Sequence, residues 1–115
     1  MVNHAGLPAD RSDEALAAWR HALESLARHE NVRLKISGIG KAGVRWSVER
    51  NGPVVSDTIA CFGVKRCLFA SNFPVDSLVV TLDALSDGFK AIVAHRTREE
   101  RLAMFHDNAC ELYGI

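Results

Sequence analysis

The segment Arg66–Asp76 constrains this chain most, because it joins a short apolar run to a turn rich in polar residues. Cys67–Ala70 is apolar, and Ser71–Pro74 interrupts it at once. A run of this length is typical of a strand buried on both faces, and Ser, Asn and Pro favour a turn. Asn72 is therefore expected at the C-terminal end of a strand, which is where α/β proteins bind their ligands.

The composition limits the size of the fold and excludes several functions. With 115 residues, the chain can form one domain but not two independent ones. A hydrophobic content of 48% and a charged content of 24% are ordinary for soluble globular proteins. Lys and Arg total 14, as do Asp and Glu, so no net charge attracts nucleic acid or an anionic membrane. No segment resembles a membrane span or a signal peptide, and we expect a cytoplasmic protein.

The three cysteines are Cys61, Cys67 and Cys110. Their number is odd, they lack the close spacing of metal-binding cysteines, and each has apolar neighbours. They are therefore interpreted as reduced residues that pack in the interior, with a reactive thiol as the alternative.

The first half of the chain repeats the α/β pattern. Ser12 precedes two acidic residues and a set of apolar residues at helical spacing, which predicts a helix over about 13–29. Residues 32–37 alternate apolar and polar side chains, which predicts a strand. A strand after a long helix favours a parallel crossover. With a short extended segment near Val2, we expect about three parallel strands with flanking helices.

The remaining signals predict one loop and three further helices. Residues 38–52 have the composition of a long polar loop, after which Pro53 suits the first position of a helix. Asp76 or Ser77 can cap the next helix. Thr97 has a glutamate three residues later, which predicts a capping box for the last helix. The apolar stripe expected on that helix consists of Leu102, Phe105, Ala109 and Leu112.

Four segments together resemble one family. VNHAGLP, NVRLKISG, FGVKRCLFASNFPVD and NACELYGI, in this order and spacing, are similar to the C-terminal part of the amidohydrolase-related family, specifically its lactonase-like predicted metal-dependent hydrolases. The resemblance covers essentially all 115 residues. It implies one partial domain over residues 1–115, formed by the last three βα units and the C-terminal helix of a distorted (β/α)8 TIM barrel. It also implies hydrolysis of a lactone, ester or amide bond by an activated water, with a divalent metal such as zinc or manganese in most members and without one in some.

The resemblance assigns roles to two residues. His4 matches the histidine of the family's H-x-G motif, which holds the metal or polarises the substrate carbonyl. Asn72 stands where many members carry an aspartate that takes a proton from the attacking water. A neutral amide cannot act as that base and is a poor ligand for a hard cation. Either Asn72 orients water or substrate, which we favour, or a neighbouring carboxylate such as Asp76 compensates, or activity has been lost.

Two residues of the strand over 32–37 are candidates for substrate binding. In a barrel, the apolar residues Val32, Leu34 and Ile36 would face the outer helices. Lys35 and Ser37 would then point inward near the open end of the barrel. The alternative is that Lys35 and Ser37 face solvent on an edge strand.

The same residue types also have structural interpretations. A lone histidine beside a turn is usually a structural group, and an asparagine before Phe-Pro usually belongs to turn chemistry. The family's H-x-H metal motif has no counterpart here, and zinc sites need three or four protein ligands. We therefore expect this chain alone to lack a complete active site.

The expected partners are a small-molecule substrate and either the N-terminal half of the barrel or a second copy. The alternative function is that of a non-catalytic, truncated α/β domain that associates with a partner chain.

Overall fold

The computed structural model describes residues 1–6, 10–41 and 43–114, so that Leu7 and Pro8 of the first family-like segment lie outside the described residues. The fold is α/β, and none of its described helices is long and apolar enough to cross a membrane. The strands are β1 (Leu34–Ile36) and β2 (Cys67–Phe69), and the helices are α1 (Asp13–Ala27), α2 (Val48–Phe62), α3 (Leu82–Ile92), α4 (Arg98–Leu102) and α5 (Asn108–Tyr113). Short helical turns span His4–Gly6, Val64–Arg66 and Val75–Leu78, and a π-helical stretch, Ala103–Asp107, joins α4 to α5.

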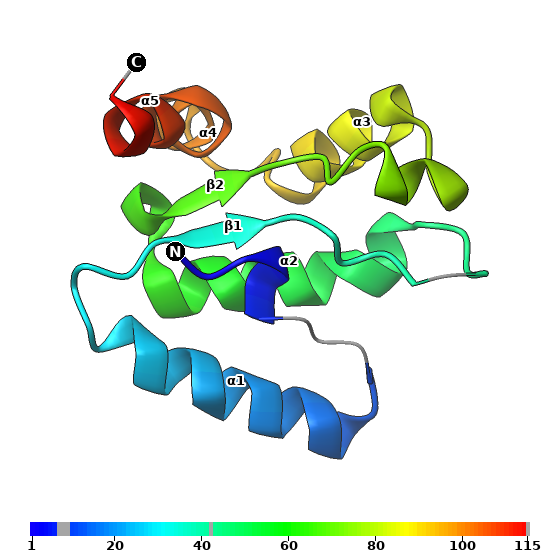
Figure 1. Ribbon diagram of the computed structural model, residues 1–115, viewed down its shortest axis with the longest axis horizontal. Helices are drawn as coiled ribbons and strands as arrows, with labels where there is room; N and C mark the ends of the chain where they lie inside the picture. The colour runs from blue at the N-terminus through cyan, green and yellow to red at the C-terminus, as the bar shows by residue number, and fades with distance from the viewer. Residues whose placement is uncertain (7–9, 42, 115) are drawn as a thin grey trace.

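The sheet is parallel, as the crossover argument predicts. Strand β1 pairs with β2 over three residues, and the Ala70 N–H extends the pairing by donating to the Ile36 carbonyl at 3.0 Å. Val2 adds one parallel bridge to Leu34 on the other side of β1. The extended segment at Val2, β1 and β2 therefore run in one direction, and Figure 1 shows the arrows of β1 and β2 pointing the same way. The third expected strand is reduced to a single bridge.

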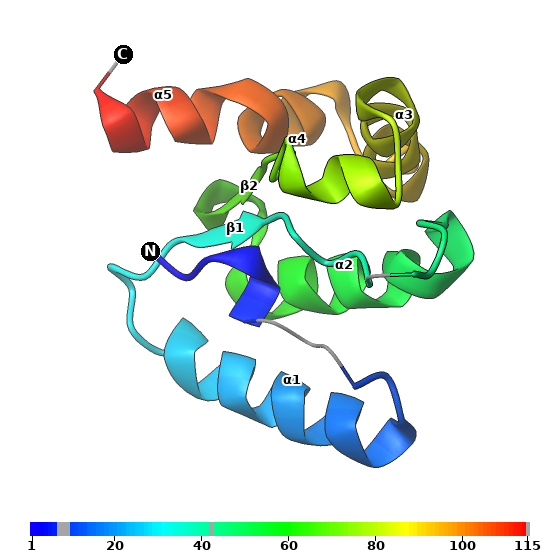
Figure 2. The same ribbon diagram turned by 45° about the vertical axis from the view of Figure 1, so that its right-hand side comes forward.

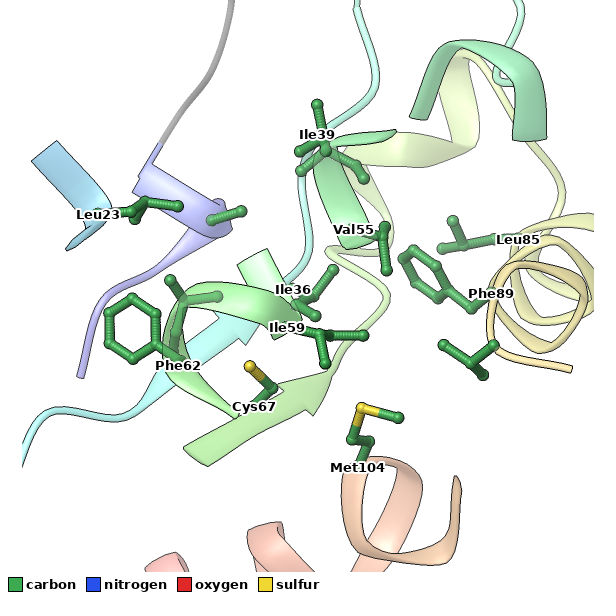
Figure 3. Close-up of a cluster of buried hydrophobic side chains, with 14 of the residues drawn as sticks. Leu23, Ile36, Ile39, Val55, Ile59, Phe62, Cys67, Leu85, Phe89 and Met104 are labelled. Atoms are coloured by element: carbon green, nitrogen blue, oxygen red, sulfur yellow. The ribbon is translucent and has the colours of Figure 1, made fainter. Parts of the chain in front are cut away.

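Helices cover this small sheet from several sides. In Figures 1 and 2, α1 and the group formed by α3, α4 and α5 lie on opposite sides of the strands, and α2 runs close to the sheet. The core joins these layers, and Figure 3 shows Ile36 and Cys67 of the strands gathered with Ile59 of α2 and Met104 of the C-terminal region. Leu34 and Ile36 are fully buried in this core, which confirms that the apolar side of β1 faces helices.

Two helix starts agree with the sequence. Helix α1 begins after Ser12, whose Oγ accepts a hydrogen bond from the Ala15 N–H. The capping box of α4 is complete, because Thr97 Oγ1 accepts from the Glu100 N–H at 3.1 Å and the Glu100 carboxylate accepts from the Thr97 N–H at 3.2 Å. Both signals are local, so they need no tertiary contact to act.

Two other helix starts were predicted wrongly. Helix α2 begins at Val48 behind the N-cap Ser47, so that Pro53 lies inside the helix and the expected loop is shorter. Neither Asp76 nor Ser77 caps α3, whose N-cap is Thr81. The reason at Asp76 is that its side chain already accepts a hydrogen bond from Asn72, on the N-terminal side. The segment Val75–Leu78 forms a separate short turn instead.

The expected apolar stripe of the last helix was right for Phe105 and Ala109, which are partly buried, and wrong for Leu102 and Leu112. Leu102 is 45% exposed and Leu112 is 38% exposed, whereas Met104 and Asn108 are the buried positions. The π-helical stretch Ala103–Asp107 changes the phase of the helix between its two ends, so that a constant spacing of 3.6 residues does not describe the buried face. Asn108 is drawn inward because its side chain hydrogen-bonds the backbone at the start of β2.

Candidate active site

Polar residues follow each of the three parallel segments at the same edge of the sheet. His4 comes shortly after Val2, Ser37 directly after β1, and Asn72 shortly after β2. Because the segments are parallel, their carboxyl ends meet at one edge, and the chain leaves β1 and β2 at the same end in Figure 1. This edge is the usual ligand-binding side of α/β proteins.

The imidazole of His4 is held by the residues that follow β1. Its Nδ1 lies 3.0 Å from Ser37 Oγ, and Ser37 is 1% exposed. Gly38 lies against the same ring, since a Cβ atom on Gly38 would come within 2.4 Å of His4 Nδ1. Two residues predicted for the site, His4 and Ser37, are therefore in direct contact, and a glycine makes room for the ring.

The turn that carries His4 has an unusual backbone. His4 and Ala5 have φ angles of 54° and 51°, in the left-handed region that residues other than glycine rarely adopt. Helix α1 braces this turn, because the indole N–H of Trp19 donates to the Ala5 carbonyl at 2.7 Å. His4 begins this turn, and its ring reaches Ser37 from there.

Asn72 is the third non-glycine residue with positive φ among the described residues, at 55°. Its Nδ2 donates to Asp76 Oδ1 at 3.0 Å, and the Asp76 N–H donates to the Asn72 carbonyl at 3.1 Å. Asp76 is 7% exposed. The turn after β2 thus holds a buried carboxylate next to the amide of Asn72. Asp76 is thus in direct contact with Asn72, and its possible compensation for the missing aspartate, one of the three explanations given above, stays a prediction.

Lys35 occupies a different position from Ser37. It lies opposite Leu68 in the sheet register, and the alternation along a strand directs its side chain to the face away from Leu34 and Ile36. Lys35 is partly buried. The structure therefore brings His4 and Ser37 into contact and puts Asn72 at the same edge, while Lys35 lies on the strand before that edge.

Sequence reasoning missed Arg11, which fixes the loop that follows β1. Its guanidinium donates to the Ile39 carbonyl at 2.7 Å and to the Asn51 side chain at 3.2 Å. Burial, together with the charge of Arg50, lowers the pKa of the Arg11 guanidinium. The partners of Arg11 lie 28 and 40 positions away in the sequence, so no local pattern could have identified these contacts.

The described residues contain no group of three or more His, Cys, Asp or Glu side chains placed to hold a metal ion. The three cysteines are free thiols, and Cys67 is fully buried. Burial raises the pKa of the Cys67 thiol to about 12, which makes it a packing residue and not a nucleophile.

Comparisons with known proteins agree with this arrangement of strands and turns. The family model described as "Amidohydrolase" matches residues 1–115. An uncharacterized protein, y4mH, of Sinorhizobium fredii is 43% identical over 115 residues, which cover 100% of this chain and 38% of that protein. An L-fucono-1,5-lactonase of Burkholderia multivorans is 32% identical over 126 aligned residues, which cover 100% of this chain and 43% of the lactonase. The chain thus spans about two fifths of the length of these relatives.

Solved structures give the same result. A crystal structure of an amidohydrolase from Burkholderia multivorans with bound HEPES superposes with a TM-score of 0.88 at 29% identity, over 99% of this chain and 44% of that one. A second crystal structure of an amidohydrolase from that organism, with bound zinc, gives a TM-score of 0.87 at 28% identity, over 98% of this chain and 43% of that one.

Proposed function

The chain belongs to the amidohydrolase family, and from this premise we propose that it carries part of the active site of a hydrolase. The proposed reaction is the opening of a lactone, ester or amide bond by an activated water molecule. The 32% identity with an L-fucono-1,5-lactonase supports a sugar lactone as the first substrate to test. Because these 115 residues span 43% of that relative, the rest of the site would lie in a part of the barrel outside them.

The proposed architecture is the last three βα units and the C-terminal helix of a (β/α)8 barrel. The parallel register of β1 and β2 and the TM-score of 0.88 with an amidohydrolase crystal structure support it. Parallel sheets normally belong to larger assemblies of strands that are covered on both faces. The described sheet has two strands, so its edges favour a partner, either the N-terminal half of the barrel or a second copy of this chain.

One observation carries the catalytic proposal. The non-glycine residues with left-handed backbone in the described part of the chain are His4, Ala5 and Asn72, and all three follow strand segments at one edge. Each such residue costs about 1 kcal/mol or more, and strain of this kind gathers at functional sites. Both turns lie at the edge of the sheet where α/β proteins bind their ligands, which supports a role in the site for both side chains. We therefore assign both side chains to the site.

His4 would act on the substrate carbonyl through Nε2, because Nδ1 already contacts Ser37. If the Ser37 hydroxyl donates to Nδ1, then Nε2 carries the proton and can donate to the carbonyl oxygen. If Nδ1 donates to Ser37, then Nε2 offers a lone pair to a ligand. In both tautomers Ser37 sets the orientation of the His4 ring. We also propose that Ser37 contacts the substrate. Lys35 would contribute a positive charge that suits the carboxylate of the product.

A divalent metal remains a proposal for the complete protein. The crystal structure of a similar amidohydrolase contains zinc, and the resemblance described above implies a divalent metal in most members of the family. The described residues of this chain do not fit such an ion by themselves, because His4 would supply one ligand where zinc requires three or four.

The proposal can be tested by reconstitution. The chain would be mixed with the N-terminal part of the Burkholderia multivorans lactonase that it does not cover, and hydrolysis of L-fucono-1,5-lactone would be measured with and without added zinc or manganese. We expect no turnover from either piece alone, because the site residues of this chain are incomplete, and turnover from the mixture.

The matched control is the lactonase itself, split at the corresponding position. If its two pieces recover activity when mixed and this chain fails in place of the C-terminal piece, the hydrolase proposal is wrong. The alternative function, a non-catalytic α/β domain that acts through a partner, would then be favoured, provided that this chain still binds the N-terminal piece.

A further inference from the structure

Asp76 is a buried carboxylate without a positively charged partner. No lysine, arginine or histidine among the described residues forms an ion pair with it, and its side-chain contact is the amide of Asn72. A buried carboxylate is costly unless it is paired or well hydrogen-bonded. One neutral donor at 3.0 Å is a modest compensation for this cost.

The turn after β2 fixes where this carboxylate lies. Two hydrogen bonds close the segment from Asn72 to Asp76, one between main-chain groups at 3.1 Å and one between side chains at 3.0 Å. Both side chains are therefore held at the C-terminal edge of β2, and the left-handed backbone of Asn72 begins the turn. Asp76 is bound to the very residue that the family resemblance marks as catalytic.

The hydrogen bond between the side chains of Asn72 and Asp76 indicates what each of these residues can do. An ionised carboxylate can only accept hydrogen bonds, so Nδ2 of Asn72 must donate and the amide oxygen must point elsewhere. The amide cannot take a proton from water, whereas the carboxylate can. A neutral asparagine at position 76 could accept the same bond from Asn72, so the turn itself does not require a charge.

We infer that Asp76 is the proton acceptor of this site and that Asn72 is the residue that positions it. The inference rests on the proposed hydrolase function. As a water oxygen forms a bond to the lactone carbonyl carbon, its proton passes to the Asp76 carboxylate. The ring C–O bond then breaks, and the leaving oxygen takes this proton from Asp76 to become the hydroxyl of the product. One water is consumed, no other reactant is needed, and the carboxylate is regenerated.

The first test measures turnover in the reconstituted assay. Asp76→Asn keeps the shape and the bond to Asn72 but removes the base, so we expect kcat to fall by about 100-fold or more with an unchanged unfolding midpoint. Asn72→Gly adopts the left-handed backbone freely and lacks the amide, so kcat should fall while KM stays the same. Asp87→Asn, an exposed aspartate of α3, is the matched control and should retain full activity.

The outcomes separate the two proposals. If the wild-type mixture hydrolyses lactone and Asp76→Asn matches it, the role of Asp76 is wrong and the hydrolase function stands. If the split lactonase is active and the wild-type mixture is not, the hydrolase function fails, and a second measurement decides whether Asp76 can reach water or a ligand at all.

The second measurement needs no turnover. A crystal structure of the mixture with the hydroxy acid product bound would be determined. We expect an ordered water or a product oxygen within about 3 Å of a carboxylate oxygen of Asp76, the distance over which a general base takes a proton. A carboxylate that surrounding side chains separate from both the ligand and water would overturn the inference.

Discussion

The imidazole of His4 lies directly against the backbone of Gly38, with no room for a side chain between them. At this scale the site depends on three contacts: the Ser37 hydroxyl at His4 Nδ1, the close approach of the His4 ring to Gly38, and the hydrogen bond from Asn72 to the buried Asp76. Each contact joins a residue of one turn to a residue of the same or a neighbouring turn. Small substitutions should therefore change the site without changing the fold.

Gly38→Ala should displace His4. The new Cβ would lie 2.4 Å from Nδ1, and the left-handed backbone of Gly38, with φ of 59°, adds strain. Gly43→Ala is the matched control, because its φ is 77° but no atom lies within 4 Å of the new Cβ. Both should lose about 1 kcal/mol through the backbone, and Gly38→Ala should lose about 1 kcal/mol more through the displaced ring. Urea unfolding and the NMR signals of the His4 ring measure the two effects, and equal losses would show that the ring moves at no cost.

Cys67 should make the stability depend on alkaline pH. The ordinary pKa of a cysteine thiol is 9.0, and burial raises that of Cys67 to about 12. Above about pH 9 the unfolded chain therefore releases a proton that the folded chain keeps, so the free energy of unfolding falls as pH rises toward 12. The slope contributed by one proton is at most about 1.4 kcal/mol per pH unit. Urea unfolding at a series of pH values should show a smaller slope in Cys67→Ala than in the wild type, and equal slopes would contradict this account of Cys67.

At the scale of elements, Asn108 joins the C-terminal helix to the sheet. Its Nδ2 donates to the carbonyls of Val64 and Cys67, both at 2.7 Å, which are the backbone groups just before and at the start of β2. Arg66 has a similar role at the other helices, because its guanidinium donates to the carbonyls of Ala27, His29 and Phe62. These two side chains hold the helix ends around the N-terminal end of β2, opposite the edge that carries the site.

Asn108→Asp should destabilise the chain more than Asn108→Ala. Alanine removes two hydrogen bonds and should lower the free energy of unfolding by about 2 kcal/mol. Aspartate cannot donate and brings a negative charge to two carbonyl oxygens, so the loss should exceed about 3 kcal/mol. Thermal or urea unfolding measures both. Glu111→Ala, at an exposed position of α5, should change stability by less than about 0.5 kcal/mol, and a similar loss there would contradict a specific role for Asn108.

At the scale of the whole molecule, the described sheet has fewer strands than a closed barrel needs. Among the described residues, two strands and one bridge leave hydrogen-bonding groups of β2 and of the Val2 segment without strand neighbours. Exposed apolar side chains such as Val75 and Leu78 lie shortly after Asn72. Unpaired strand edges and exposed apolar side chains are typical of surfaces that bind another chain.

The isolated chain should therefore associate with itself as its concentration rises. Size-exclusion chromatography with light scattering over a dilution series should show oligomers that dissociate on dilution. Addition of the N-terminal lactonase piece should replace them with a one-to-one complex, because both would use the same edges. If the chain stays a soluble monomer at all concentrations and does not bind the N-terminal piece, the proposal that it forms part of an incomplete barrel is wrong.

Local sequence patterns were enough to predict much of the secondary structure of this protein. The helix after Ser12, the capping box at Thr97, the two short strands and the polar turn at Asn72 all depend on residues within a few positions of one another. The order of motifs also indicated the family, which the match over residues 1–115 confirmed. The predictions failed where a local signal competed with another: Ser47 and not Pro53 starts α2, and Thr81 and not Asp76 starts α3.

Only the tertiary structure decided which residues meet. The contact between His4 and Ser37 spans 33 positions, and the bonds of Asn108 span 41 and 44. Such pairs form because parallel strands bring distant turns to one edge, and no spacing within the sequence encodes that choice. The sequence by itself thus determined the elements and the kinds of polar residue at their ends. The packing of the strands determined that His4 is held by Ser37, and the surrounding structure buries the carboxylate of Asp76, whose contact with Asn72 four positions away is itself local.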